Sequence, residues 1–269
     1  MTDSHLHRER TVPAEVIILR RVDLREMDRI FVVLSDRFGK LSMIAKGVRR
    51  PTARAASHLE LFSRARVMLA RGRDLEIVTA AEALDLHINL RSDLNAMATA
   101  SHLTELVDQF LPEHEDAKIT YRNLSTALHA LDQGCDPSRV ARWFEMQLLM
   151  VAGIRPELQE CVVCGRQVTA EPNAFNPQLG GVVCGDHAAS SGATILLSVG
   201  AQKVLRLLVR EDLAAYLRLA AAPGVDAELE SALTAFLKFH LERDLRSLRV
   251  MRRVEESIPV WSSAYKSTK

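Results

Sequence analysis

The sequence predicts a multidomain α+β protein, because the spacing of its apolar residues changes along the chain. Short apolar runs with a strand-like period extend from Ala14 to about Glu82, and helical spacing with more alanine follows Leu90. A polar segment containing glycine and proline interrupts the helical part between about residues 160 and 192, and it holds three of the four cysteines. A chain of 269 residues, 48% of them hydrophobic, is long enough for two or three compact units.

Short strands are expected throughout the N-terminal part, residues 1–82. Asp36 to Gly39 has the composition of a hairpin turn, and a longer basic loop with Pro51 follows the third strand. Five strands in about 70 residues, with one long connection, predict a small Greek-key barrel of the OB type, and an SH3-like barrel is the alternative. The expected strands are residues 15–22, 29–35, 40–45, 61–70 and 73–80.

A helical domain is expected in two parts, residues 83–159 and 193–254, on either side of the cysteine-containing insertion at 160–192. The pair Asp136-Pro137 has the composition of a helix start. The last helix carries a sustained apolar stripe, which indicates packing in a bundle. Residues 255–269 are expected to form a flexible tail. The expected helices are residues 94–110, 117–131, 136–152, 199–209, 213–221 and 227–251.

The charge of the chain is segregated. Between Arg37 and Arg73, ten basic residues stand against a single acid, Glu60, which gives this stretch +9 in a chain whose total is +1. These charges alternate with strand-like apolar runs, so we expect them on a fixed surface suited to the phosphates of nucleic acids. The alternative is a solvated face that binds nothing. The predicted DNA-binding residues are Arg37, Lys40, Lys46, Arg49, Arg50, Arg54, Arg64, Arg66, Arg71 and Arg73.

Contacts with phosphates are expected to outweigh contacts with bases. Aromatic residues make up only 5% of the chain, which disfavours a module that stacks many bases on aromatic side chains. If the basic residues share one barrel face, about four to seven phosphates would be neutralised, with a log-log salt slope on single strands on the order of −3 to −5. Such a surface can hold two strands close together while leaving their base edges free to pair.

The cysteines have the spacing of a metal site. Cys161 and Cys164 form one short pair, Cys184 and His187 form another, and 19 residues separate the two pairs. Tetrahedral Zn²⁺ takes thiolate sulfur and imidazole nitrogen, and four protein ligands leave no open position, so one structural zinc ion per chain is predicted. The alternative is a set of unmetallated thiols. Cys135 lies outside this spacing.

The sequence offers no enzyme site. Gly39-Lys40 lacks the remaining glycine of a phosphate-binding loop, and the acidic clusters lie in turn-like segments, so we expect no covalent catalysis. The polar N-terminus and the lack of a long apolar stretch predict a cytoplasmic protein with no membrane association. A zinc-containing transcription factor or adaptor is the rival function, because the last helix carries arginines that could read bases. They are Arg243, Arg246, Arg249, Arg252 and Arg253.

Several segments carry a resemblance to a known family. They include Asp28 to Leu41 and, most specifically, Ala45 to Pro51. Further similarity lies in Leu61-Phe62, in residues 75–82, in the cysteine-containing insertion and in the late helix up to Leu248. On these residues the chain resembles the bacterial recombination mediators of the RecO family, over essentially its whole length beyond the first dozen residues.

The resemblance implies a role in DNA repair. It implies binding of single- and double-stranded DNA, annealing of complementary strands without ATP, and help in loading the recombinase filament onto DNA coated by single-strand DNA-binding protein. It also implies two protein partners, RecR and the C-terminal tail of the single-strand DNA-binding protein, and a location at the bacterial nucleoid. His187 departs from the four-cysteine form expected of zinc-bearing members. Some relatives lack the cluster, so zinc would support the fold and need not take part in the activity.

Overall fold

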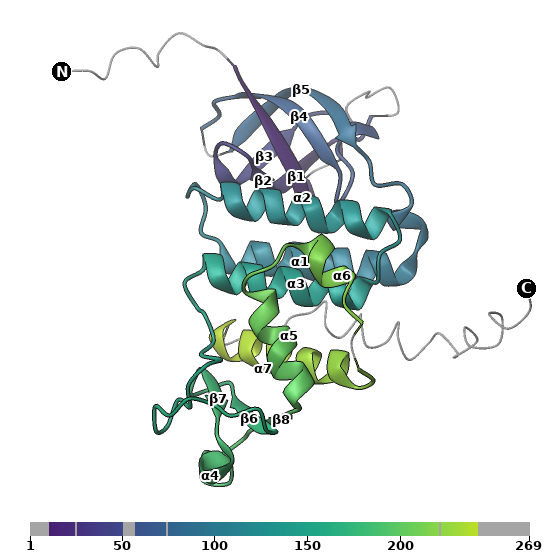
Figure 1. Cartoon of the computed structure of the whole chain (residues 1–269). Helices are drawn as coiled ribbons and strands as arrows, with labels where there is room; N and C mark the ends of the chain where they lie inside the picture. Colours follow the sequence, from purple (N-terminus) through teal and green to yellow (C-terminus); the bar gives the residue numbers. More distant parts are fainter. Residues whose placement is uncertain (1–10, 25, 51–56, 74, 221, 242–269) are drawn as a thin grey trace, which may run out of the picture. The chain divides into compact units, whose positions relative to one another are not determined.

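The computed structural model describes residues 11–24, 26–50, 57–73, 75–220 and 222–241 (Figure 1). They form two compact units, and each unit draws on two parts of the sequence. The first contains the residues up to Ile88 together with Thr104–His129, and the second contains Asn89–Leu103 and the residues from Ala130 onward. Two helices, α1 (Leu94–Phe110) and α2 (Lys118–Asp132), therefore contribute to both units.

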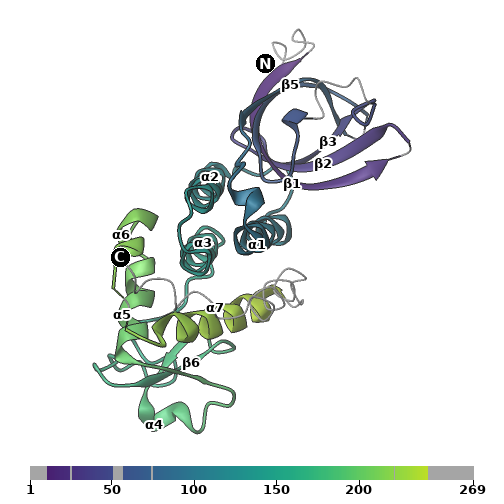
Figure 2. The same cartoon turned by 90° about the vertical axis from the view of Figure 1, so that its right-hand side faces the viewer.

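The first unit contains a closed five-stranded barrel, seen as a ring of strands in Figure 2. Its strands are β1 (Val12–Leu24), β2 (Asp28–Ser35), β3 (Gly39–Ala45), β4 (Arg64–Ala70) and β5 (Glu76–Asp85). Their order around the barrel is β1-β2-β3-β5-β4, and all neighbours are antiparallel except β3 and β5. This Greek-key closure confirms the predicted OB-type barrel.

Side chains along each strand alternate between the barrel core and its outer face. In β4, Ala65, Val67 and Leu69 are buried in the core, so Arg64 and Arg66 between them point outward. The predicted start of the fifth strand at Arg73 is wrong, because Arg71 and Arg73 lie in the β4–β5 turn. The turn is tight at Gly72, where a Cβ would collide with the carbonyl oxygen of Leu75.

Part of the outer face of the barrel is covered within the same unit. Ile17 and Leu34 are paired across β1 and β2, alternate with core residues and face outward, yet they are only 1% and 0% exposed. Residues of the 104–129 segment contact this region, since Asp108 binds both Arg20 and Lys40. Burial, and next the carboxylate of Glu15 on β1, raise the pKa of the Tyr121 hydroxyl on α2.

The loop between α1 and α2 also docks on the barrel. The backbone N–H of His114 donates to the carbonyl oxygen of Lys40 at 2.8 Å, and the Ser42 hydroxyl donates to the Glu113 carboxylate at 3.1 Å. Gly39 has φ +66°, and a Cβ there would collide with the carbonyl oxygen of Glu115. Glycine is therefore required at the start of β3 for both conformation and space.

The second unit combines helices with a small sheet. Its helices include α3 (Pro137–Val151), α5 (Val199–Leu208), α6 (Leu213–Leu217) and α7 (Val225–Leu241), and a 3₁₀ turn, η2 (Leu90–Ser92), precedes α1. The predicted helix start at Asp136-Pro137 is confirmed, because the Asp136 carboxylate accepts hydrogen bonds from the N–H groups of Ser138 and Arg139. The sheet has the order β7-β6-β8, with β6 (Asn173–Asn176), β7 (Gly181–Val183) and β8 (Ile195–Leu197).

The core of the second unit contains a buried charged triad. His102 Nε2 lies 2.7 Å from Oε1 of Glu145, and Arg142 donates to the same oxygen at 2.8 Å. Arg142 and Glu145 are one helical turn apart on α3, and the three side chains are at most 1% exposed. The triad joins α3 to the part of α1 that belongs to this unit.

Three expectations for the C-terminal part fall beyond the described residues. The last helix is described as far as Leu241, so the predicted continuation to residue 251, its arginine group and the tail at 255–269 lie outside the described chain. Among the helices that the structure describes, none combines the length and apolarity that crossing a membrane requires.

Candidate metal centre and nucleic-acid interface

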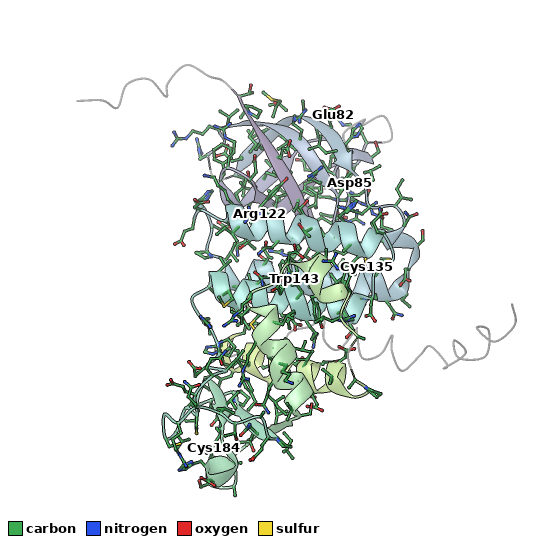
Figure 3. The ribbon with its side chains drawn as sticks, viewed as in Figure 1. Glu82, Asp85, Arg122, Cys135, Trp143 and Cys184 are labelled. Carbon is green, nitrogen blue, oxygen red and sulfur yellow. The ribbon has the colours of Figure 1, made fainter. Side chains whose placement is uncertain are left out.

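The four predicted metal ligands come together in the second unit. One ligand atom each from Cys161, Cys164, Cys184 and His187 can be chosen so that all lie within 4.8 Å of one another. Sγ of Cys184 is 4.0 Å from Sγ of Cys164 and 3.2 Å from Nδ1 of His187 (Cys184 is labelled in Figure 3). Ligands at Zn–S and Zn–N distances in a tetrahedron would be about 3.5 to 3.8 Å apart, so the donor set fits a tetrahedral ion.

Each ligand pair is shaped by a backbone turn. After Cys161, the N–H of Gly165 returns to the Cys161 carbonyl oxygen at 2.8 Å, and Gly165 has φ +71°. The second pair frames the one-turn helix α4 (Gly185–Ala188), in which the N–H of His187 donates to the Cys184 carbonyl oxygen at 3.0 Å. Each turn brings two side chains to the same side of the chain, which is what a shared ion needs.

The environment of the sulfur atoms favours thiolate at Cys161. Burial opposes its ionisation, but N–H groups of Cys184, Cys164 and Val163 donate toward it and together lower its pKa to about 6. Burial raises the pKa of Cys184. Since the thiolate is the metal-binding form of cysteine, the lowered pKa suits Cys161 to ligation.

Arg166 connects the two ligand pairs. Its Nε donates to Sγ of Cys164 at 3.5 Å, and its Nη2 donates to the Asp186 carboxylate at 2.7 Å. The ligand Cys161 is also part of a small buried cluster with Ala174 and Val183, which ties the site to β6 and β7. Four protein ligands held in this way can fix an ion that stabilises the fold, and they leave no position for a substrate.

The predicted DNA-binding residues are distributed over several parts of the barrel. Lys46, Arg49 and Arg50 follow the end of β3, Arg71 and Arg73 lie in the β4–β5 turn, and Arg37 lies in the β2–β3 turn. Arg64 and Arg66 are on the outer face of β4, and Arg54 lies outside the described residues. The described basic residues therefore lie on two strands and in three connections of the barrel.

Lys40 is not on the surface, although the sequence placed it with the exposed cations. The residue is 8% exposed, and its ammonium donates to the carbonyl oxygen of Asp108 at 2.5 Å and to its carboxylate at 3.4 Å. Charge pattern alone cannot show that a helix from later in the chain covers this part of β3.

Other members of the basic group differ in how far acids neutralise them. Arg66 pairs with Glu15 at 3.1 Å, and Arg49 lies 3.6 Å from Asp23. Arg64 is half-buried, and its cross-strand partner on β5 is Asp85. In contrast, Lys46, Arg50, Arg71 and Arg73 are exposed, and none forms an ion pair with a residue that the structure describes.

Sequence reasoning missed a set of ion pairs beside the β1–β2 turn. Arg29 binds Asp23 at 2.6 Å, and Arg21 binds Glu60 at 2.9 Å. The carboxylate of Asp23 has a lowered pKa, caused first by the hydrogen bond from Arg29. The Asp23–Arg29 ion pair could have been predicted from the sequence, because a hairpin that turns at residues 25–27 places Asp23 opposite Arg29.

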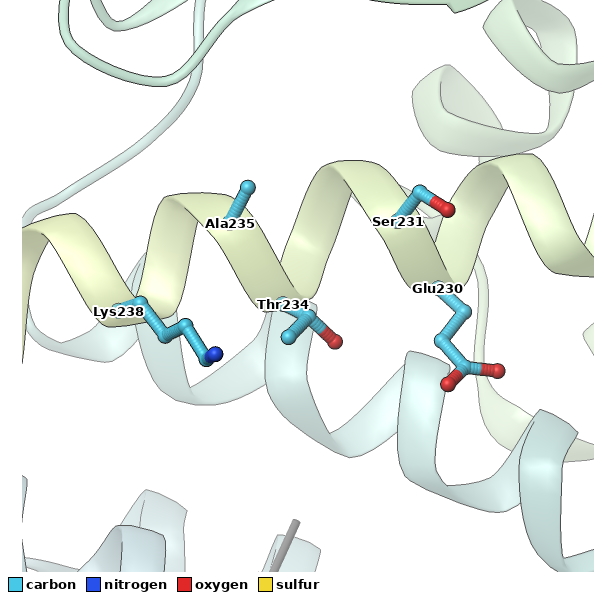
Figure 4. Close-up of a pocket in the computed structure, with 5 residues that line it drawn as sticks. All are labelled: Glu230, Ser231, Thr234, Ala235 and Lys238. Carbon is cyan, nitrogen blue, oxygen red and sulfur yellow. The ribbon is translucent and has the colours of Figure 1, made fainter. Parts of the chain in front are cut away.

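The second unit also has a hollow of about 260 Å³ on α7, shown in Figure 4. Glu230, Ser231, Thr234, Ala235 and Lys238 line it, all from one side of the helix. Glu230 and Lys238 carry opposite charges, and the hydroxyls of Ser231 and Thr234 lie between them along the helix.

A closed OB-type barrel followed by helices and a Cys₃His cluster defines a multidomain OB-fold protein with a candidate structural metal site. Two family models match the chain: "Recombination protein O N terminal" over residues 10–87 and "Recombination protein O C terminal" over residues 91–249. The chain belongs to the RecO family of DNA repair proteins.

Individual relatives agree with this assignment. A DNA repair protein RecO from Roseiflexus sp. (strain RS-1) is 37% identical over 96% of this chain and 90% of its own length. RecO proteins from Desulforudis audaxviator and Dehalococcoides mccartyi are 37% and 34% identical, over 89% and 86% of this chain and 96% and 91% of their own lengths.

Proposed function

We propose that this RecO-family protein is an ATP-independent recombination mediator. It binds single- and double-stranded DNA, anneals complementary strands and, together with RecR, helps to load the recombinase onto DNA coated by single-strand DNA-binding protein. The C-terminal tail of that binding protein is its second protein partner, and the nucleoid is its place of action. The observation that supports DNA binding best is the set of exposed cations Lys46, Arg50, Arg71 and Arg73 on the barrel, which form no ion pair with any residue in the described part of the chain.

The exposed cations suit annealing because they neutralise phosphates without reading bases. Two polyanions repel each other, so a surface that neutralises phosphates lowers the cost of bringing them together. Lysine and arginine side chains on turns contact phosphates without reading a base pattern, so base edges stay free to pair with the second strand. No nucleotide hydrolysis is needed, because pairing itself releases free energy.

The proposed metal is one structural zinc ion per chain, held by Cys161, Cys164, Cys184 and His187. Bound there, zinc would supply no catalysis, only a cross-link between the two ligand pairs. The support is the convergence of four ligand atoms and the lowered pKa of Cys161.

Annealing of two complementary oligonucleotides, each coated with single-strand DNA-binding protein, tests the function. The protein should accelerate annealing without ATP, and the acceleration should fall as salt rises. The double variant Arg71→Gln, Arg73→Gln should bind single strands more weakly and reduce the log-log salt slope by about 1.4, which is about 0.7 for each lost phosphate contact. The control Arg66→Gln removes a cation that Glu15 already pairs, and it should change the slope less.

Absence of acceleration despite DNA binding would contradict annealing and leave a passive DNA-binding protein or adaptor. A footprint confined to one defined sequence would favour the transcription-factor alternative. No DNA binding at any salt concentration would contradict the whole proposal.

A further inference from the structure

The small sheet of the second unit has one covered edge and one open edge. On the β7 side, the N–H of Val182 donates to the carbonyl oxygen of Glu157 at 2.8 Å, and the carbonyl oxygen of Val182 accepts from the N–H of Val162 at 3.0 Å. β8 forms the other edge, beyond β6 (Figure 1). No strand of the described chain pairs with the outer side of β8.

Alternation along the strands identifies the backbone groups that β8 leaves open. Both backbone groups of Val182 point away from β6, so Phe175, its partner on β6, directs its own backbone groups toward β8. Phe175 and Ile195 are therefore a hydrogen-bonded pair. The adjacent pair, Ala174 and Leu196, is then a non-hydrogen-bonded pair. The N–H and C=O of Leu196 consequently point outward, and no described residue bonds to either group.

Apart from its short length, the open edge lacks the features that usually keep strand edges from pairing. Leu196 is 74% exposed, more than any other large apolar side chain that the structure describes. Residues 188–202 contain no charged residue and no proline, and the pairing of β8 with β6 has no bulge. Natural proteins protect an open edge with such features or cover it with another element. We therefore expect another strand to cover β8.

The chemistry of this edge suits a second copy of the same edge. A two-fold axis at Leu196 would make a hydrogen-bonded pair with the second copy's Leu196, in which each N–H donates to the carbonyl oxygen of the other. The Cα atoms of such a pair are about 5.5 Å apart, and the two leucine side chains lie on the same face and shield each other from water. Two uncharged edges do not repel each other, whereas a charged peptide would find no opposite charge on β8.

We propose that β8 is a self-association edge, at which two copies of the chain join their small sheets into one continuous sheet across a two-fold axis at Leu196. The edge is short, because the next outward N–H, that of Ser198, already donates to the Glu228 carboxylate at 2.6 Å. Stable interfaces bury about 1,200 to 2,000 Å², which an edge of three residues does not reach. The association is therefore weak and depends on protein concentration, and it does not require DNA.

Sedimentation velocity on the whole chain, from micromolar to near-millimolar concentration, tests the association. The parent protein should shift from monomer to dimer as its concentration rises. Leu196→Lys places like charges directly opposite each other and removes apolar contact, so it should weaken the dimer about tenfold or more. The matched control is Leu179→Lys, at a leucine of the β6–β7 turn that is 49% exposed, and it should associate like the parent. The melting temperatures of both variants show that they are folded.

Hydrogen exchange resolved to single amides tests the geometry without any substitution. The N–H of Leu196 should exchange more slowly as the protein concentration rises, whereas the N–H groups of Ile195 and Leu197, which point toward β6, should not change. A parent protein that stays monomeric, or a dimer that Leu196→Lys leaves intact, would overturn the self-association edge. Loss of RecR binding in Leu196→Lys, without a dimer of the parent, would assign β8 to a different protein partner and overturn it as well.

Discussion

The ammonium of Lys40 donates a hydrogen bond to the main-chain carbonyl oxygen of Asp108 at 2.5 Å and lies 3.4 Å from its carboxylate. Lys40 begins the outward-facing positions of β3, and Asp108 is in the part of α1 that belongs to the same unit. The contact uses a cation of the basic segment to hold a helix on the barrel.

Replacing Lys40 should therefore affect stability and not DNA affinity. Lys40→Met removes a charge-assisted hydrogen bond and should lower the free energy of unfolding by about 1 to 3 kcal/mol. Lys46→Met, at an exposed site without an ion pair among described residues, should leave stability within about 0.5 kcal/mol and weaken DNA binding. Urea denaturation and fluorescence anisotropy measure the two effects. The reverse pattern would show that Lys40 leaves Asp108 to contact DNA.

Purified protein should contain one zinc ion per chain, measured by elemental analysis. A metal that binds only the folded state stabilises it by about 4 kcal/mol at a thousand times its Kd, so a strong chelator should lower the melting temperature. Cys184→Ser should lose the metal, and Cys135→Ser, outside the cluster, should keep it. A protein with no metal and an unchanged melting curve after chelation would contradict the site.

Arg166 should tune the affinity of the metal site. Its guanidinium donates to the Cys164 sulfur and binds Asp186 beside the second ligand pair. Three thiolates and one divalent cation leave a net negative charge, which the guanidinium offsets. Arg166→Gln should weaken zinc binding about tenfold, as measured by competition with a chromogenic chelator. Lys203→Gln, an exposed cation on α5, is the control, and equal affinities in the two variants would exclude this role.

The buried triad should make a large contribution to the second unit. Glu145→Leu leaves Arg142 buried without its anionic partner, which typically costs about 3 to 5 kcal/mol. Glu171→Gln, at an exposed acid of the same unit, should be nearly neutral. Thermal or urea unfolding compares them. A Glu145→Leu variant as stable as the parent would mean that Arg142 finds another acceptor.

Local patterns in the sequence predicted much of the barrel and of the metal site. β2 was expected at 29–35 and lies at Asp28–Ser35, and the four expected metal ligands do converge. Both successes depend on short-range features: strand alternation in one case, and two short-spaced ligand pairs in the other. The small sheet β7-β6-β8 was missed, because strands of three or four residues are too short to show a period.

The failures concern contacts between distant parts of the chain. The basic residues of one stretch were expected to be exposed together, but the described ones lie on different turns and strands, and Lys40 is buried against Asp108 of α1.

The barrel's dependence on residues 104–129 has a consequence for synthesis of the protein. A ribosome makes the five strands before it makes the second half of α1 and most of α2. Until then, the outward-facing Ile17 and Leu34 lack their cover, and the nascent barrel presents an apolar surface to its surroundings. Completion of the N-terminal fold must therefore wait for roughly forty further residues beyond the last strand, which takes a few seconds at typical translation rates. Transiently exposed apolar surface of this kind makes folding intermediates prone to aggregate.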